Sequence, residues 1–79
     1  MTIKELCALL ASYPPDSLVI LSKDGEGNAF SPLADANPGR YDARGTWSGD
    51  FLEEELIGDS EYSQPSEDAV PAVCLWPTN

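Results

Sequence analysis

Carboxylates dominate the side chains of this chain that could do chemistry. The 79 residues include 14 Asp and Glu against 4 Lys and Arg, which gives a formal net charge of -10. The four cations all lie within residues 1–44, so residues 45–79 carry eight carboxylates and no compensating charge. Charge concentrated on one half of a small domain indicates a surface that meets a positively charged partner. The eight residues are Asp50, Glu53, Glu54, Glu55, Asp59, Glu61, Glu67 and Asp68.

Aromatic residues are interleaved with these acids, and Trp47 is the best surface anchor among them. Its neighbours Thr46, Ser48 and Gly49 are small or polar, so we expect its indole to be exposed and available to a partner protein. An ordered row of carboxylates can imitate duplex DNA, which carries one charge per about 1.7 Å of axis. The predicted partner is therefore a basic protein surface. The open alternative is a solvated face that only keeps the protein soluble.

Catalysis is disfavoured by the residue types present. The chain contains no histidine, which is the usual general base, and neighbouring residues such as Glu53 and Glu54 do not face one another on a helix. A chain of this length also buries too little surface to enclose a deep active site. We therefore expect no enzymatic activity and no cofactor.

A calcium loop is one alternative for the polar run at residues 24–28. Asp24, Glu26 and Asn28 occupy positions one, three and five of such a loop, and Asp35 occupies position twelve. Position six, however, holds Ala29 where a calcium loop needs glycine. A hairpin turn whose polar side chains bond their own backbone is the favoured interpretation, so no metal is expected.

A small anion such as a nucleotide is a second alternative. Lys23, Arg40 and Arg44 could converge on it, because the guanidinium fork suits phosphate oxygens. The competing interpretation is ordinary surface pairing with nearby carboxylates. The net charge of -10 also opposes the approach of an anion, including DNA, RNA or an anionic membrane.

The N-terminal element that must support these side chains is a helix. Thr2 and Glu5 stand three positions apart, as in a capping box, and Pro14 with Pro15 must end the helix. Apolar residues recur at helical spacing and predict a face packed on a sheet. These residues are Ile3, Leu6, Leu9, Leu10 and Tyr13, with Cys7 beside them.

A hairpin is predicted next. The continuous apolar run at residues 18–21 favours a central strand buried on both faces, and residues 23–28 have turn chemistry. Residues 29–33 are expected to return antiparallel with Phe30 inward. Pro32 cannot donate to a ladder, so this second strand should lie at an edge or end early.

The second half of the chain gives weaker signals. Residues 37–39, Asn-Pro-Gly, predict a turn, and residues 41–44 a short strand. Residues 51–57 favour a short helix over a strand, with Gly58 as its C-cap. Residues 59–68 predict a solvated or mobile loop, and residues 70–76 predict a closing strand.

The predicted fold is therefore a single α+β domain over residues 1–79. An N-terminal helix packs on a small, mainly antiparallel sheet of three to four strands, and an acidic loop or short helix precedes the last strand. Cys7 and Cys74 are expected to be reduced and buried. The longest apolar runs fall far short of the roughly 20 residues of a membrane span, so we expect a cytoplasmic protein.

Three stretches resemble a family of small tailed-bacteriophage proteins. They are TIKEL with YPPD near the start, LSKDGEGNAFSPL in the hairpin, and VPAVCLWP near the end. The resemblance implies a viral origin and a site of action in the cytoplasm of the infected bacterium. It also implies that the EGN turn and the LWP ending are features shared by the family. It assigns no role to any residue.

These inferences lead to one functional expectation. The protein is expected to bind a basic surface of a host nucleic-acid-binding or defence protein and to inhibit it as a DNA mimic does, in an anti-restriction or anti-CRISPR role. The alternatives are a module that sequesters a small nucleotide or cation, and a structural or oligomeric phage accessory protein.

Overall fold

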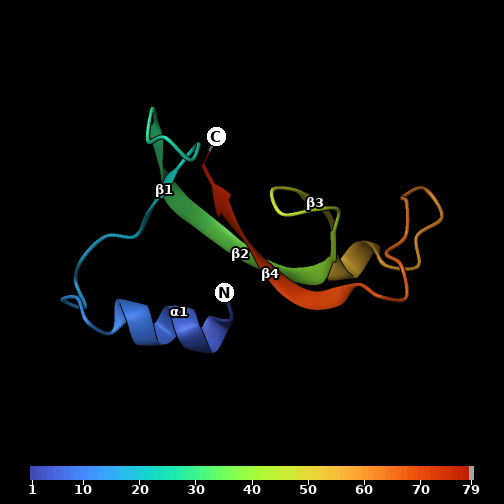
Figure 1. The fold of residues 1–79 in the computed structure, drawn as a ribbon, viewed down its shortest axis with the longest axis horizontal. Helices are drawn as coiled ribbons and strands as arrows, with labels where there is room; N and C mark the ends of the chain where they lie inside the picture. Colours follow the sequence, from blue (N-terminus) through green and yellow to red (C-terminus); the bar gives the residue numbers. More distant parts are fainter. Residues whose placement is uncertain (79) are drawn as a thin grey trace.

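The computed structural model describes residues 1–78, which form one helix and a four-stranded antiparallel sheet (Figure 1). The predicted α+β arrangement is confirmed. In chain order the elements are the helix α1 (Ile3–Leu10), the strands β1 (Ile20–Ser22), β2 (Phe30–Ala43) and β3 (Gly49–Glu53), the 3₁₀ helix η1 (Glu54–Leu56), and the strand β4 (Val70–Pro77).

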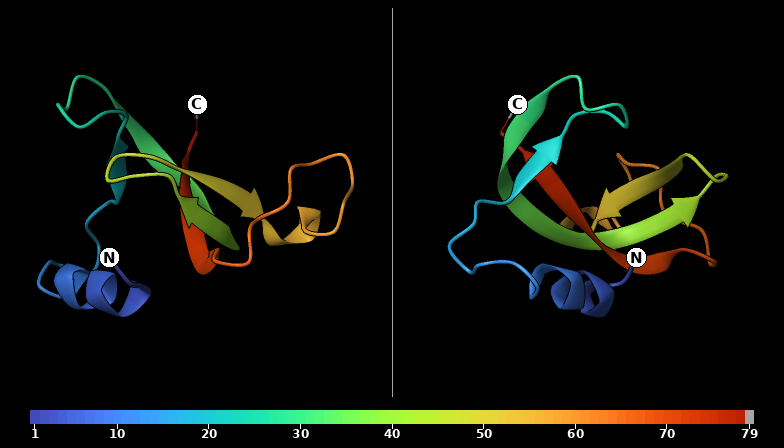
Figure 2. Two further views of the ribbon diagram at one scale, coloured as in Figure 1. Left: turned by 45° about the vertical axis from the view of Figure 1, so that its right-hand side comes forward. Right: turned by 60° about the vertical axis from the view of Figure 1, so that its left-hand side comes forward.

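The long strand β2 organises the sheet because each of the other strands pairs with it. β1 pairs with its first residues, with Ser22 opposite Phe30. β4 pairs with residues 33–41 of β2 and β3 pairs with residues 39–43, so Gly39 lies opposite Glu53 on one side and Ala72 on the other. The pairing with β4 contains an irregularity between Leu33 and Asp35. Figure 2 shows β2 as a long, strongly curved ribbon with β4 beside it.

The predicted turn at residues 37–39 is wrong, because these residues lie inside β2. Pro38 is tolerated there since β3 pairs with β2 only from Gly39 onward, which leaves one side of Pro38 without a partner strand. Pro32 likewise does not end the strand, and it lies opposite Ile20 on the edge strand β1. The predicted short strand at residues 41–44 is the end of β2.

The apolar run at residues 18–21 does not form a buried central strand. β1 spans only Ile20–Ser22 and lies at the edge, where β2 is its single neighbour. Leu18 precedes the strand and is 90% exposed. Phe30, predicted to point inward, is 61% exposed opposite Ser22. The centre of the sheet is β2, whose sequence contains two prolines and no continuous apolar run.

The helix α1 begins as predicted. The Thr2 amide donates to the Glu5 carboxylate at 3.0 Å, and the Glu5 amide donates to the Thr2 hydroxyl at 3.1 Å, which completes the capping box. The predicted packing of its apolar face is not found, because no residue of α1 is buried and Ile3 is 64% exposed. Residues 11–19 lead from the helix to the edge strand, so α1 lies beside the sheet without covering it (Figure 1).

The cysteines are free, and their predicted burial is wrong for Cys7. Cys7 is exposed because α1 is uncovered, whereas Cys74 on β4 is half-buried and its pKa is raised by that burial.

The predicted short helix at residues 51–57 is wrong for most of its length. Residues 51–53 belong to β3, and only Glu54–Leu56 is helical, as η1, with Gly58 at a φ of 94° just beyond it.

Two aromatic rings lie against glycines where β2 meets β3. The Phe51 ring lies over Gly39 and the Tyr41 ring lies over Gly49. Each glycine has no side chain, and the ring that lies over it fills that space. Gly39 and Ser31 are the buried residues within the part of the chain that the structure describes, and no apolar side chain there is fully buried. Close approach of strands, not a deep core, therefore shapes this sheet.

Alanine at Gly39 is expected to destabilise the fold. A Cβ there would collide with the Leu52 carbonyl oxygen and stand 2.6 Å from Phe51 Cζ. Overpacking of this kind costs about 1–3 kcal/mol, which denaturant unfolding followed by circular dichroism would measure.

Gly45 provides the matched control. A Cβ at Gly45 meets nothing within 4 Å, and its φ is not positive, so Gly45→Ala should leave the unfolding midpoint unchanged or raise it slightly. Equal midpoints for the Gly39 and Gly45 variants would contradict the packing described here.

Candidate protein-interaction surface

Seven of the eight predicted carboxylates gather at one end of the molecule. Glu53 ends β3, Glu54 and Glu55 belong to η1, and the other four lie in the loop at residues 57–69 (Figure 1). We call this set the acidic end. Its members are Glu53, Glu54, Glu55, Asp59, Glu61, Glu67 and Asp68. Glu53 is half-buried and the remaining six are exposed, and within residues 1–78 none of the seven takes part in an ion pair.

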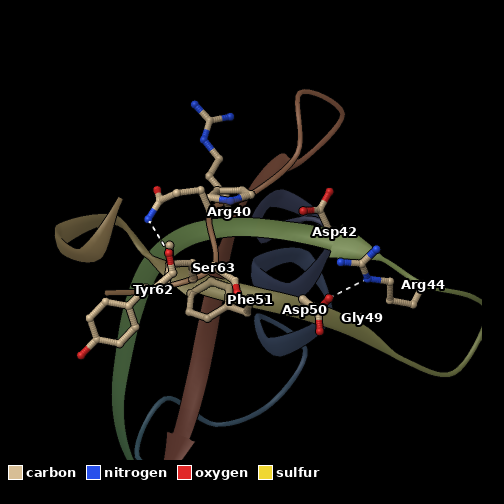
Figure 3. A pocket seen from close by; sticks show the side chains of 11 residues that line it. Arg40, Asp42, Arg44, Gly49, Asp50, Phe51, Tyr62 and Ser63 are labelled. Atoms are coloured by element: carbon tan, nitrogen blue, oxygen red, sulfur yellow. Dashed lines mark hydrogen bonds and ion pairs between the residues drawn. The ribbon is translucent and has the colours of Figure 1, made fainter. Parts of the chain in front are cut away.

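Asp50 differs from the other predicted carboxylates because it is paired. It lies on β3 opposite Asp42 of β2, an arrangement in which two like charges face each other. Arg44 relieves this repulsion, since its Nε donates to Asp50 Oδ2 at 2.6 Å (Figure 3). Asp50 is thus neutralised locally and adds little to the negative field of the acidic end.

Gln64 holds the loop that carries most of the acidic end. Its Oε1 accepts from the Gly58 amide at 2.7 Å, and its Nε2 donates to the carbonyl oxygens of Asp59 at 2.8 Å and Tyr62 at 3.1 Å. One side-chain amide therefore satisfies backbone groups along several residues of loop. Sequence reasoning missed this role, although a lone glutamine in a loop rich in Ser, Pro and Asp was a signal.

Asp42 and Ser66 tie the same loop to the sheet. The Ser66 amide donates to Asp42 Oδ2 at 2.9 Å, and the Ser66 hydroxyl donates to Asp42 Oδ1 at 2.5 Å. The hydroxyl first, and the amide after it, hold the pKa of the Asp42 carboxyl below its ordinary value. The predicted solvated or mobile loop is therefore exposed, and it is held by the hydrogen bonds of Gln64 and by the Asp42–Ser66 contact.

Trp47 stands apart from the acidic end. It lies at the turn between β2 and β3, which the Arg44 amide closes by donating to the Ser48 carbonyl oxygen at 2.9 Å, and it is 94% exposed. The left view of Figure 2 shows this turn and the loop at residues 57–69 projecting in opposite directions. The structure brings Trp47 near Asp50 through the hairpin, and it separates Trp47 from the acids of the loop.

An open hollow of about 510 Å³ lies between the end of the β2–β3 hairpin and the loop at residues 62–65. Arg40 and Arg44 both line it, as the anion-binding alternative required, but so do Asp42 and Asp50. The side chain of Arg40 extends away from Arg44 in Figure 3. Lys23 does not line the hollow, because it lies in the turn between β1 and β2.

The polar run at residues 24–28 forms a turn that bonds its own backbone. Asp24 Oδ1 accepts from the amides of Glu26 at 2.8 Å and Asn28 at 3.2 Å, and Asp24 Oδ2 accepts from Asn28 Nδ2 at 3.1 Å. These bonds, the Asn28 amide first, lower the pKa of Asp24. Asp35, the proposed twelfth position of a calcium loop, lies on β2 opposite Trp76. Residues 1–78 contain no group of three or more His, Cys, Asp or Glu placed to hold a metal ion.

Comparison with protein-family models, with curated proteins and with solved structures finds no match to this chain. Within residues 1–78 no helix has the length and apolar character needed to cross a membrane. The surface must therefore be interpreted from its own residues.

Removing the Ser66 hydroxyl is expected to raise the pKa of Asp42. The depressed pKa means that the Asp42–Ser66 contact stabilises the fold at neutral pH, and that this stabilisation is lost as the pH falls through the folded-state pKa of Asp42. A pH titration of the Asp42 carboxyl by NMR should show a higher midpoint in Ser66→Ala than in the unaltered protein.

Ser63→Ala is the control, since Ser63 lies in the same exposed loop and makes no side-chain hydrogen bond within the described residues. An Asp42 midpoint that is the same in both variants would show that Ser66 does not tie the loop to β2.

Proposed function

We propose that this protein binds a basic surface of a host nucleic-acid-binding or defence protein and inhibits it by occlusion, as a DNA mimic. The observation that carries the proposal is the acidic end, where seven carboxylates lie together without an ion pair among the described residues. Carboxylates that form no ion pair within the described residues keep their charge available to neutralise Lys and Arg of a nucleic-acid-binding groove. Opposite charges on the two sides of an interface favour the correct partner and speed association.

Pre-organisation supports the proposal. A mobile acidic loop loses conformational entropy when it binds, and this cost lowers its affinity. The loop at residues 57–69 is already held by Gln64 and by the Asp42–Ser66 contact, so less ordering remains to be done on binding. These contacts use the side chains of Gln64, Ser66 and Asp42, and they leave the carboxylates of Glu61 and Glu67 to the partner.

Trp47 adds an apolar anchor at the other end of β3. A strand of five residues spans about 17 Å at 3.4 Å per residue, so the hairpin tip and η1 mark the two ends of an elongated contact. An indole that is 94% exposed is costly to leave in water and gains most from a pocket on a partner. The proposed contact therefore runs from Trp47 past Asp50 to the acidic end.

The host assignment rests on the resemblance to small tailed-bacteriophage proteins. The resemblance implies action inside the infected cell, so the proposed partner is a protein of the bacterial cytoplasm. Host restriction and CRISPR proteins have the required chemistry, because their nucleic-acid grooves are lined with Lys and Arg that contact phosphate.

Removing two charges from η1 is expected to weaken capture of the partner. Immobilised protein would be incubated with bacterial extract, and bound proteins would be eluted between about 0.05 and 0.5 M salt and identified by mass spectrometry. Glu54→Gln with Glu55→Gln should lower the eluting salt concentration, because fewer exposed carboxylates remain to be screened. Duplex DNA added to the extract should compete with the immobilised protein.

The matched control is Asp16→Asn with Glu26→Gln, which changes the net charge equally in the N-terminal part of the chain. This variant should capture the same proteins as the unaltered protein. Capture that resists salt, resists duplex DNA and is equal for both double variants would contradict occlusion by the acidic end.

A small anionic ligand is the second candidate function, and the position of Arg40 favours it. Arg40 lines the open hollow together with Phe51 and Tyr62, and no carboxylate within 4.0 Å pairs with it in the described residues. Binding would raise the unfolding temperature of the protein. Nucleoside mono- and triphosphates at about 1 mM should then shift the unaltered protein but not Arg40→Gln, and the absence of any shift would remove this candidate.

A further inference from the structure

The folded chain exposes more surface than its mass accounts for. Its accessible surface is 6585 Å², whereas a compact monomer of 8.5 kDa exposes about 4,700 Å². The radius of gyration is 14.6 Å, against roughly 12 Å for a compact domain of this length. Some 1,900 Å² per chain is therefore exposed in excess, and in residues 1–78 no apolar side chain is fully buried.

The exposed large apolar side chains are concentrated in the first 30 residues. Sixteen large apolar side chains are exposed in the described part of the chain, and nine of them precede Ser31. They come from the residue Met1 before α1, from α1, from the connection after it, from β1 and from the first residue of β2. We call this set the apolar end, and its members are Met1, Ile3, Leu9, Leu10, Tyr13, Leu18, Val19, Ile20 and Phe30.

Charge is distributed in the opposite way. Residues 1–30 carry four carboxylates and two lysines, which gives a net charge of −2, whereas residues 31–79 carry ten carboxylates and two arginines, which gives −8. In Figure 1 α1 and β1 lie toward one end of the long axis, and the loop at residues 57–69 lies at the other. The surface that gains most from leaving water is therefore the surface with the least charge repulsion.

We propose that a second copy of this chain covers the apolar end and that the protein is an isologous homodimer. In such a dimer the apolar face of α1 and the residues around β1 form the core that each chain lacks alone. The excess of two chains totals about 3,800 Å² over their whole surfaces, which sets the upper limit of such a contact and lies within the 2,000–5,000 Å² typical of obligate homodimers.

A second copy fits this surface better than a different protein for two reasons. A chain without a core of its own needs a covering partner to be stable, and most soluble oligomers are built from copies of one chain, two-fold dimers being the commonest. The extent of the molecule along its long axis is 43 Å. Contact through the apolar ends therefore keeps the two acidic ends several Debye lengths of about 8 Å apart, where salt screens their repulsion.

The first test uses the unaltered protein. Sedimentation equilibrium should give twice the chain mass of 8.5 kDa, and the unfolding temperature should rise by roughly 8 °C when the protein concentration rises a hundredfold. A monomer mass together with an unfolding temperature that does not depend on concentration would overturn the proposal, even if a different protein were found to bind α1.

The second test compares two charge insertions on the same helix. Leu10→Glu places a carboxylate in the apolar face of α1, and Ala8→Glu places it on the opposite, polar face. The Leu10 variant should dissociate, or unfold at a lower temperature, at concentrations where the Ala8 variant remains a dimer. Equal masses and equal unfolding temperatures for the two variants would overturn the assignment of the interface to this face.

Discussion

Backbone pairing with β2 is the constraint on which the rest of this structure depends. β1, β3 and β4 each pair with that strand, so each takes its position from the register it adopts on β2. Close packing supports the register where Phe51 lies over Gly39 and Tyr41 over Gly49. At the far end the Thr78 amide donates to the buried hydroxyl of Ser31 at 3.1 Å, which ties the end of β4 to the start of β2. The strand pairing thus fixes the arrangement of the sheet, although no apolar side chain in residues 1–78 is fully buried.

The exposed acidic residues and the exposed apolar residues lie on different parts of the molecule. Apart from Glu53, which ends β3, the residues of the acidic end lie on η1 and on the loop at residues 57–69, outside the strand ladder. Gln64 and Ser66 hold that loop through hydrogen bonds that do not involve the carboxylates of the acidic end. The apolar residues lie on α1 and β1, at the opposite end of the long strand. Recognition of a partner and self-association are thereby proposed for separate surfaces.

Local signals in the sequence predicted the elements that depend only on near neighbours. The Thr2–Glu5 capping box, the turn held by Asp24 and the closing strand β4 are all read from residues a few positions apart. The path of β2 through Pro38 was not predictable, because tolerance of that proline depends on where β3 stops pairing. The Asp42–Ser66 contact joins residues 24 positions apart and has no local signature. The acids were found by composition, whereas their gathering at one end required the fold.

The uneven charge of the two ends also makes each single chain an electric dipole. A net charge of −8 on residues 31–79 against −2 on residues 1–30, spread along a 43 Å axis, experiences a torque in the field of any cationic surface. In the dimer proposed above the two acidic ends point outward, so η1 and its loop would face a basic partner from either end of the dimer. Orientation before contact removes much of the random rotational search that normally limits how often a collision between two proteins becomes a complex.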